Sequence, residues 1–177
     1  MCCEQDGETM NIFDYALQLE KDGETLYHDL AADAPGSGLD AVFTRLADAE
    51  ARHYRVVSDM KNAVPDPELV ETEVIETAAN IFTRLQAEKD PDRFADPEAT
   101  DRCVEAYRRA ADIEKKSMEF YRSKAGETGD TVQRALFERL AEEEKRHYWV
   151  VLNILKYVSR PDFNWIEFAE WNHMEAY

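Results

Sequence analysis

Two Glu-x-x-His motifs in the sequence have the residue types and the spacing of a metal site. They are Glu50-x-x-His53 and Glu144-x-x-His147, and a single glutamate lies 30 residues before each, at Glu20 and Glu114. Residues i and i+3 share one face of an α-helix, so the carboxylate and the imidazole of each motif point the same way. Carboxylate oxygens and imidazole nitrogens bind divalent iron, manganese and zinc. The chemistry to expect is metal binding.

These side chains fall on the apolar stripes of the expected helices. Glu20, for example, lies between Ala16 and Tyr27 on a stripe with helical periodicity, and the other three glutamates and both histidines are placed in the same way. The stripes also predict that Tyr54 and Tyr148 face the core. A solvated acidic face would instead place the charges opposite the stripe. We therefore expect four glutamates and two histidines to point into one core.

The positions of the turns predict that these residues meet at one level. Glu20 lies 15 residues before Pro35 and Glu50 lies 15 residues after it, and Glu114 and Glu144 are equally spaced about Gly129. At about 1.5 Å per helical residue, the chain travels equally far along both helices of each hairpin. Four carboxylates in one core repel each other unless cations neutralise them. Two divalent cations would do so, with the two imidazoles completing the ligand set.

Five helices must position this cluster. Capping residues, first-turn prolines and glycine-containing turns predict helices over about 11–33, 37–62, 97–125 and 131–158, and a shorter one that begins near Asp66-Pro67-Glu68. Beyond Pro161 we expect a short amphipathic helix with Trp165, Phe168 and Trp171, and no segment has the period-two pattern of a strand.

An internal repeat organises the chain. A shift of 94 positions aligns residues 16–60 with 110–154 without a gap, and 16 of the 45 pairs are identical. Two related helical hairpins joined by a long crossover make a four-helix bundle. The prediction is a single all-α domain over 1–177, with repeat halves of about 10–62 and 97–158, a crossover at 63–96 that contains an extra helix, and a tail at 159–177.

Composition excludes several classes of protein. A formal net charge of −17 argues against nucleic acid and anionic membranes as partners, since both need a cationic surface. With 33% charged residues, the sequence has no apolar run long enough to span a membrane. No signal peptide is visible, and the three cysteines form no CxxC pair, which favours a cytoplasmic protein with free thiols.

The motifs Glu20, Glu50-x-x-His53, Glu114 and Glu144-x-x-His147 resemble the di-iron domain of the rubrerythrins, within the ferritin-like superfamily, over residues 10–158. The resemblance implies two iron ions per chain, with manganese or zinc as alternatives. It implies that Glu20 and Glu114 are terminal or bridging ligands, that Glu50 and Glu144 bridge the metals, and that His53 and His147 each bind one. Tyr27 and Tyr121 match family tyrosines that hydrogen-bond the ligating carboxylates, although both would also suit an ordinary core.

The sequence departs from this family in two respects. Full-length rubrerythrins carry a rubredoxin-like iron domain with two cysteine pairs, which this sequence does not contain, so we expect an external electron donor such as a rubredoxin. Many members also have a further ligating glutamate where this chain has Ser117, and the repeat-equivalent position is Gly23. A plain six-ligand site is expected.

Our first functional hypothesis is a non-haem di-iron oxidoreductase that reduces hydrogen peroxide or reacts with dioxygen. The alternatives are an iron-binding or ferroxidase protein without reductive turnover, and an interaction module with a structural metal. A ferritin-like storage role would require a large hollow assembly, whereas we expect a homodimer, with the helix near 70–85 or the tail at its interface.

Several other acidic residues near histidines are not expected to bind metal. Glu170 and His173 repeat the motif in the tail but have no partner glutamate, and Glu24 and His28 form an exposed pair. In the run 142–144, only Glu144 is expected to point inward, and the other two glutamates are expected to be solvated.

Overall fold

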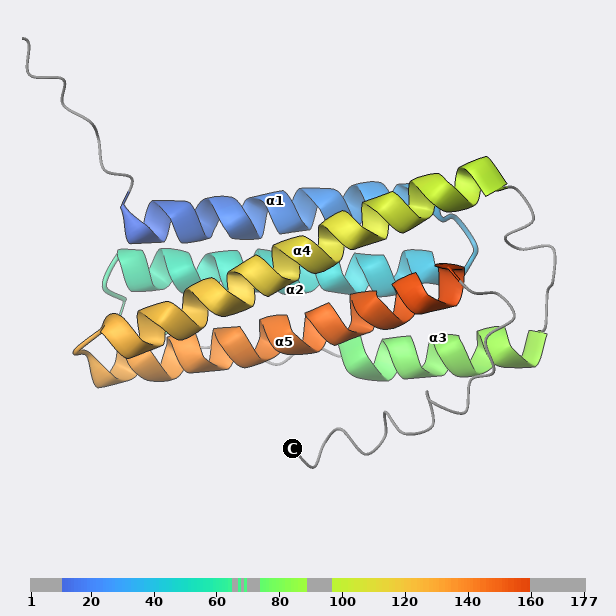
Figure 1. Ribbon diagram of the computed structural model, residues 1–177. Helices are drawn as coiled ribbons and strands as arrows, with labels where there is room; N and C mark the ends of the chain where they lie inside the picture. The colour runs from blue at the N-terminus through green and yellow to red at the C-terminus, as the bar shows by residue number, and fades with distance from the viewer. Residues whose placement is uncertain (1–10, 65–66, 68, 70–73, 89–96, 160–177) are drawn as a thin grey trace, which may run out of the picture.

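The structure is a computed structural model, which describes residues 11–64, 67, 69, 74–88 and 97–159. All regular secondary structure within these residues is helical: α1 (Ile12–Asp33), α2 (Leu39–Lys61), α3 (Val74–Glu88), α4 (Pro97–Glu127) and α5 (Thr131–Ser159) (Figure 1). The predicted all-α bundle is confirmed. The aromatic tail, expected to form a further helix, lies outside the described residues.

The first hairpin, α1 and α2, begins and turns where its capping residues predict. The side chain of Asn11 accepts a hydrogen bond from the backbone N–H of Phe13 at 3.0 Å, which satisfies one free donor at the start of α1. The turn contains Gly36 and Gly38, with φ values of 71° and 86°, in the left-handed region that glycine adopts without strain. The chain therefore reverses within five residues.

The second hairpin, α4 and α5, follows the same plan. Pro97 occupies the first position of α4, where its missing N–H costs nothing. Asp130 caps α5, since its Oδ1 accepts hydrogen bonds from the backbone N–H groups of Val132 at 2.8 Å and Gln133 at 3.1 Å. Both helices begin where the sequence predicts and end within two residues of the expected positions.

Helix α3 begins later than the sequence predicts. The Asp-Pro-Glu signal placed its start near Pro67, but Pro67 and Leu69 are not helical, and α3 begins at Val74. The buried side chain of Leu69 packs against the core, and its carbonyl accepts a hydrogen bond from Arg139 at 2.6 Å. These contacts hold Leu69 against the bundle and outside a helix, so at this residue tertiary packing overrides the local capping signal.

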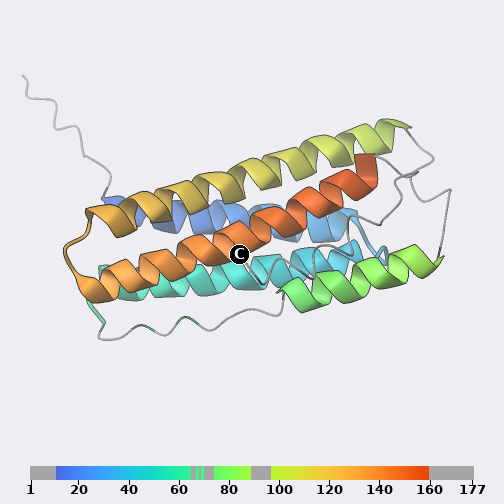
Figure 2. The same ribbon diagram turned by 60° about the horizontal axis from the view of Figure 1, so that its bottom comes forward.

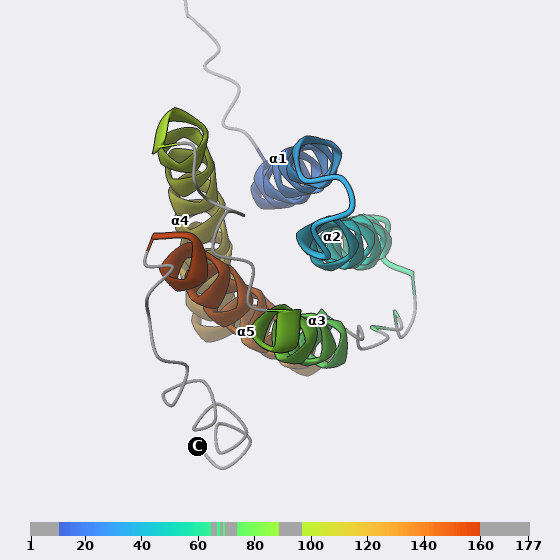
Figure 3. The same cartoon turned by 90° about the vertical axis from the view of Figure 1, so that its right-hand side faces the viewer.

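The two hairpins lie side by side, and α3 runs along one flank where it contacts α2 and α5 (Figures 2 and 3). Val74 and Ala78 of α3 are buried in an apolar cluster with residues of all four bundle helices. A second apolar cluster, which includes Val57, Tyr121 and Phe137, fills the other end of the bundle. The glutamates and histidines predicted to bind metal belong to neither cluster. None of the described helices combines the length and the apolar character that crossing a membrane requires.

Candidate metal centre

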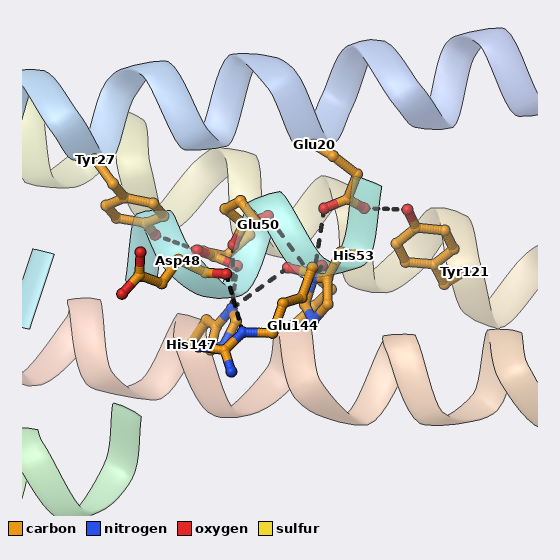
Figure 4. Close-up of polar contacts among 10 residues, drawn as sticks. Glu20, Tyr27, Asp48, Glu50, His53, Tyr121, Glu144 and His147 are labelled. Atoms are coloured by element: carbon orange, nitrogen blue, oxygen red, sulfur yellow. Dashed lines mark hydrogen bonds and ion pairs between the residues drawn. The ribbon is translucent and has the colours of Figure 1, made fainter. Parts of the chain in front are cut away.

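All six predicted ligands lie buried in the middle of the bundle (Figure 4). Each of the four bundle helices contributes a glutamate, and α2 and α5 each add a histidine one helical turn further on. The exposed fraction of every one of these side chains is 3% or less: Glu20, Glu50, His53, Glu114, Glu144 and His147. The polar cluster is thus fully enclosed by protein.

His53 is surrounded by three of the glutamates. Its Nδ1 lies 2.8 Å from Oε1 of Glu144, 3.4 Å from Oε2 of Glu20 and 3.8 Å from Oε2 of Glu50. Glu20 and Glu50 come from the same repeat half as His53, whereas the nearest carboxylate, that of Glu144, comes from the other half. We call the space between Glu20, His53 and the two shared glutamates Glu50 and Glu144 the His53 position.

His147 has the repeat-equivalent surroundings. Its Nδ1 lies 3.2 Å from Oε1 of Glu50, 3.8 Å from Oε2 of Glu114 and 3.9 Å from Oε2 of Glu144. The nearest carboxylate is again that of the other half. Glu114, His147 and the same two shared glutamates define the His147 position. The two imidazole rings stack with their centroids 5.4 Å apart, so the two positions are neighbours.

Tyr27 and Tyr121 lie at opposite ends of the cluster along the bundle (Figure 4). The hydroxyl of Tyr27, on α1, donates a hydrogen bond to Oε1 of Glu114 on α4, and the hydroxyl of Tyr121, on α4, donates to Oε1 of Glu20 on α1. Burial, strengthened by the neighbouring carboxylates, raises the pKa of both phenols well above their ordinary value. Both tyrosines are therefore neutral donors that fix one oxygen of a carboxylate on the opposite hairpin.

The carboxylates repel each other and are poorly solvated. Burial, followed by the charges of the other glutamates, raises the pKa of Glu50 and of Glu144 well above the ordinary value. Burial also raises the pKa of Glu114 to about 7, although its hydrogen bond from Tyr27 opposes the shift. Among the buried side chains of the described residues there is no lysine or arginine to neutralise this charge.

The two histidines respond in opposite directions. Burial alone would lower the pKa of His53, but Glu20 and Glu50 outweigh it and raise the pKa to about 9. Burial, with the charges of His53 and Arg146, lowers the pKa of His147 well below its ordinary value. The protein alone can thus offset only a small part of the negative charge of the cluster, which is a strong electrostatic reason to expect cations.

The free donor atoms of the cluster fit two metal ions. Six buried ligand atoms have no hydrogen-bond partner: Oε2 of Glu20, both ring nitrogens of His53, Oε2 of Glu114, Oε1 of Glu144 and Nε2 of His147. Buried polar atoms are rarely left unpaired. If two donor atoms each lie about 2.1 Å from one metal ion and subtend a right angle at it, they are about 3 Å from each other. The shortest nitrogen–oxygen distances in the cluster, 2.8 Å from His53 to Glu144 and 3.2 Å from His147 to Glu50, are close to this value. Glu50, His53, Glu144 and His147 also bring one donor atom each within 4.8 Å of one another.

Small residues lie beside the ligands on α1 and α4. A Cβ atom added to Gly23 would lie 3.3 Å from Cδ and from Oε2 of Glu50, so the missing side chain leaves room for that carboxylate. The repeat-equivalent Ser117 is also buried, with an exposed fraction of 3%. The two positions therefore line the cluster without supplying a carboxylate to it.

Two expectations about neighbouring residues are wrong. Glu143, expected to be solvated, is buried with an exposed fraction of 6%, and its Oε1 lies 3.4 Å from NH1 of Arg146. Tyr54, expected to face the core, is 38% exposed. Its position on the helix places the side chain to one side of the buried face that Val56 and Val57 occupy. The repeat contained a signal for Glu143: the equivalent residue in the first half is Ala49, an apolar residue.

The pair of Glu24 and His28 lies apart from the cluster. Oε1 of Glu24 lies 4.0 Å from Nε2 of His28, whose side chain is 59% exposed. Glu170 and His173 lie outside the described residues.

The fold and the site together define a helical-bundle protein with a di-iron-like site, in which two histidines and four glutamates are buried at the seam between two repeated hairpins. The profile of the rubrerythrin family matches residues 11–155, and the chain belongs to this family. Comparisons with curated proteins and with solved structures gave no match.

Proposed function

We propose that the protein is a di-iron oxidoreductase that reduces hydrogen peroxide, or reacts with dioxygen, with electrons from an external donor. The observation that carries this proposal is the set of six buried donor atoms without hydrogen-bond partners in a family of di-iron proteins. Glu20 and His53 would hold one ion, Glu114 and His147 the other, and Glu50 and Glu144 would be shared. Two ferrous ions supply two electrons, which with two protons reduce one hydrogen peroxide to two waters.

The contribution of the protein is to hold the carboxylates in fixed positions around this chemistry. Each tyrosine hydroxyl occupies one oxygen of Glu114 or Glu20, which leaves the other oxygen, Oε2, as the free donor that faces a histidine. Tyr27 and Tyr121 stack on Phe43 and Phe137, with ring centroids 6.3 Å and 6.0 Å apart. The ring contacts keep the hydroxyls in place and exclude water from both ends of the cluster.

The same arrangement keeps the two tyrosines from adding charge to the site. The phenolic protons stay on the tyrosines at neutral pH because burial raises their pKa, so neither tyrosine adds a negative charge to the four glutamates. A compact, buried and acidic site of this kind stabilises cations strongly. The electron donor, which we propose to be a rubredoxin or a similar small redox protein, would dock on the outside of the bundle. A homodimer and a cytoplasmic location complete the proposal.

Stopped-flow mixing of the anaerobic diferrous protein with hydrogen peroxide, and separately with dioxygen, tests this function. We expect rapid oxidation by at least one oxidant, with one peroxide consumed per two irons. Glu50→Ala removes a shared carboxylate and should slow oxidation, whereas Glu119→Gln changes a 61% exposed side chain on α4 and should not. Oxidation of the wild type no faster than that of Glu50→Ala would contradict the proposal.

Oxidation experiments of this kind also distinguish the proposed oxidoreductase from the alternative, a protein that handles iron without reductive turnover. A protein that only oxidises and releases iron would consume dioxygen with added Fe(II) as its sole electron donor and would retain fewer than two irons per chain afterwards. Repeated turnover with an added reductant, and retention of the iron, supports the oxidoreductase.

A further inference from the structure

A row of three aromatic rings leads from the metal cluster to the surface of the protein. Tyr121, whose hydroxyl donates to Glu20 at the His53 position, is buried (Figure 4). Its ring centroid lies 5.3 Å from that of Phe120, and the Phe120 centroid lies 5.1 Å from that of Tyr15. Both distances fall in the range of about 4.5–7 Å at which aromatic rings are in contact. Tyr15 is 42% exposed, so the row reaches solvent.

The ring contacts of the other tyrosine of the cluster end inside the protein. Tyr27 stacks on Phe43, and the ring centroid of Phe43 lies 5.3 Å from that of Tyr107. The exposed fraction of Tyr107 is only 4%. These rings therefore fill the core instead of opening a way to the surface.

The row to the surface is not a product of the internal repeat. The shift of 94 positions that relates the two halves places Leu26 where the row has Phe120, and Arg109 where it has Tyr15. The second half of the site thus lacks the two outer rings, although both halves keep the tyrosine that contacts a glutamate. The row is a separate feature of the His53 position.

The outer end of the row lies on a basic stretch of an otherwise acidic chain. The net charge of the whole chain is −17, but residues 108–127 of α4 carry six basic and three acidic side chains outside the metal cluster. Lys116 and Lys124 lie one helical turn before and after Phe120, and so share its face of α4. The ammonium group of Lys124 lies 5.7 Å from the centroid of the Phe120 ring. A protein with an acidic surface is attracted to this face and repelled by most of the remaining surface.

We propose that the face formed by Tyr15, Phe120, Lys116 and Lys124 docks a small acidic protein that carries one electron, and that its electrons reach the metal cluster along the row of rings. Each carrier loses one electron, and one ferric ion of the oxidised cluster gains it. Two carriers thus restore the two ferrous ions that the reduction of one hydrogen peroxide oxidises.

Contact between the rings is what favours this path. Electron transfer through a protein slows steeply with distance, and it is faster through atoms in contact than across gaps. The row provides such contacts from the exposed ring of Tyr15 to Tyr121, and the hydrogen bond from Tyr121 to Glu20 continues them to a candidate ligand. This inference rests on the proposed function, because it requires a metal cluster that is oxidised and then reduced again.

A carrier that cannot transfer electrons tests docking by itself. The probe is an acidic rubredoxin in which zinc replaces the iron, titrated by isothermal calorimetry into the iron-loaded protein. Binding should weaken as salt is added, because surface charges attract the two proteins. Lys116→Gln should weaken binding about two- to fivefold, the effect of one surface charge pair. Lys156→Gln, which removes the same charge from an exposed side chain of α5, should leave binding unchanged.

The path is tested by stopped-flow mixing of the oxidised, iron-loaded protein with reduced iron rubredoxin in the absence of dioxygen. Phe120→Leu keeps an apolar side chain but removes the middle ring. It should slow reduction at saturating rubredoxin severalfold while the affinity for the zinc form stays the same. Tyr54→Leu removes a ring that is 38% exposed on α2, and it should change neither quantity. Elemental analysis should give the same iron content for both variants as for the wild type.

Three results would overturn the inference. The first is that zinc rubredoxin does not bind, or binds wild type and Lys116→Gln equally. The second is that Phe120→Leu is reduced as fast as the wild type. The third is that Tyr15→Glu changes the oligomeric state in size-exclusion chromatography, which would assign this face to a contact between copies of the chain. Rapid reduction of the wild type by rubredoxin without any consumption of peroxide would instead contradict the proposed function and support the docking site.

Discussion

Removal of the metals should invert the pH dependence of stability. In the metal-free protein the pKa of Glu114 rises from 4.5 to about 7 on folding. A carboxyl group whose pKa is raised in the folded state stabilises the protein while it is protonated, and this stabilisation is lost as the pH rises through the folded-state pKa. Between pH 5 and pH 8, ionisation of Glu114 alone should lower the free energy of unfolding by about 2–3 kcal/mol.

Other groups of the cluster mostly add to this loss. The raised pKa of Glu50 and of Glu144 acts in the same direction. The stabilisation from His53, whose pKa rises from 6.5 to about 9, is lost between those values. His147 opposes them, because its lowered pKa gives stability above pH 6.5 that disappears as the pH falls. For a chain of 177 residues, a loss of about 2–3 kcal/mol corresponds to a decrease in Tm on the order of 4–12 °C.

The metal-loaded protein should behave in the opposite way. Metal ions bind ionised carboxylates and compete with protons, so the stabilisation by metal grows as the pH rises. Differential scanning calorimetry of chelator-treated and reloaded protein at pH 5, 6, 7 and 8 should show a Tm difference that widens towards pH 8.

Variants of two glutamates on α4 separate this effect from general electrostatics. Glu114→Gln cannot ionise and should flatten the pH dependence of the metal-free form, whereas the exposed Glu119→Gln should leave it unchanged. A metal-free protein whose Tm increases from pH 5 to pH 8, or an unchanged slope in Glu114→Gln, would refute the electrostatic account of the cluster.

Further predictions concern metal content, the tyrosines, the small residues and assembly. Elemental analysis of iron-grown protein should give two metals per chain, and His147→Ala should lose about one of them while circular dichroism shows an intact fold. Tyr27→Phe and Tyr121→Phe should each destabilise the protein by about 1–2 kcal/mol in denaturant titrations, and by similar amounts because the repeat gives them equivalent bonds. Gly23→Ala should weaken metal binding in calorimetry, since its Cβ would crowd Glu50 at 3.3 Å. Size-exclusion chromatography should show a dimer at micromolar concentration; a monomer, or a particle of hundreds of kilodaltons, would contradict this expectation.

The helices and the cluster could be predicted because the determining signals are local or repeated. Capping residues such as Asn11 and Asp130 and the apolar stripes define the helices, and equal spacing about the two turns brings the glutamates to one level. Such signals depend on helix geometry alone. They need no knowledge of how the hairpins pack.

The features that could not be predicted depend on packing between elements. The start of α3 follows from contacts of Leu69 with the bundle rather than from its own capping signal. Likewise, Tyr27 donates to Glu114 instead of to the glutamate of its own half, because α1 and α4 run side by side in the folded bundle. The burial of Glu143 belongs to the same class, since helical periodicity places it beside the stripe and only the packed bundle covers it.

The crossed contacts explain why the site lies at the seam between the hairpins. His53 is closest to Glu144, and His147 is closest to Glu50, so each histidine faces a shared carboxylate of the opposite half. The two tyrosines cross the seam in the same way. A single hairpin could supply only three of the six ligands, and its carboxylates would lack the tyrosine donors. The metal centre therefore requires both halves. Bound metal should link them, because separation of the hairpins would remove each shared glutamate from the histidine that it faces in the opposite half.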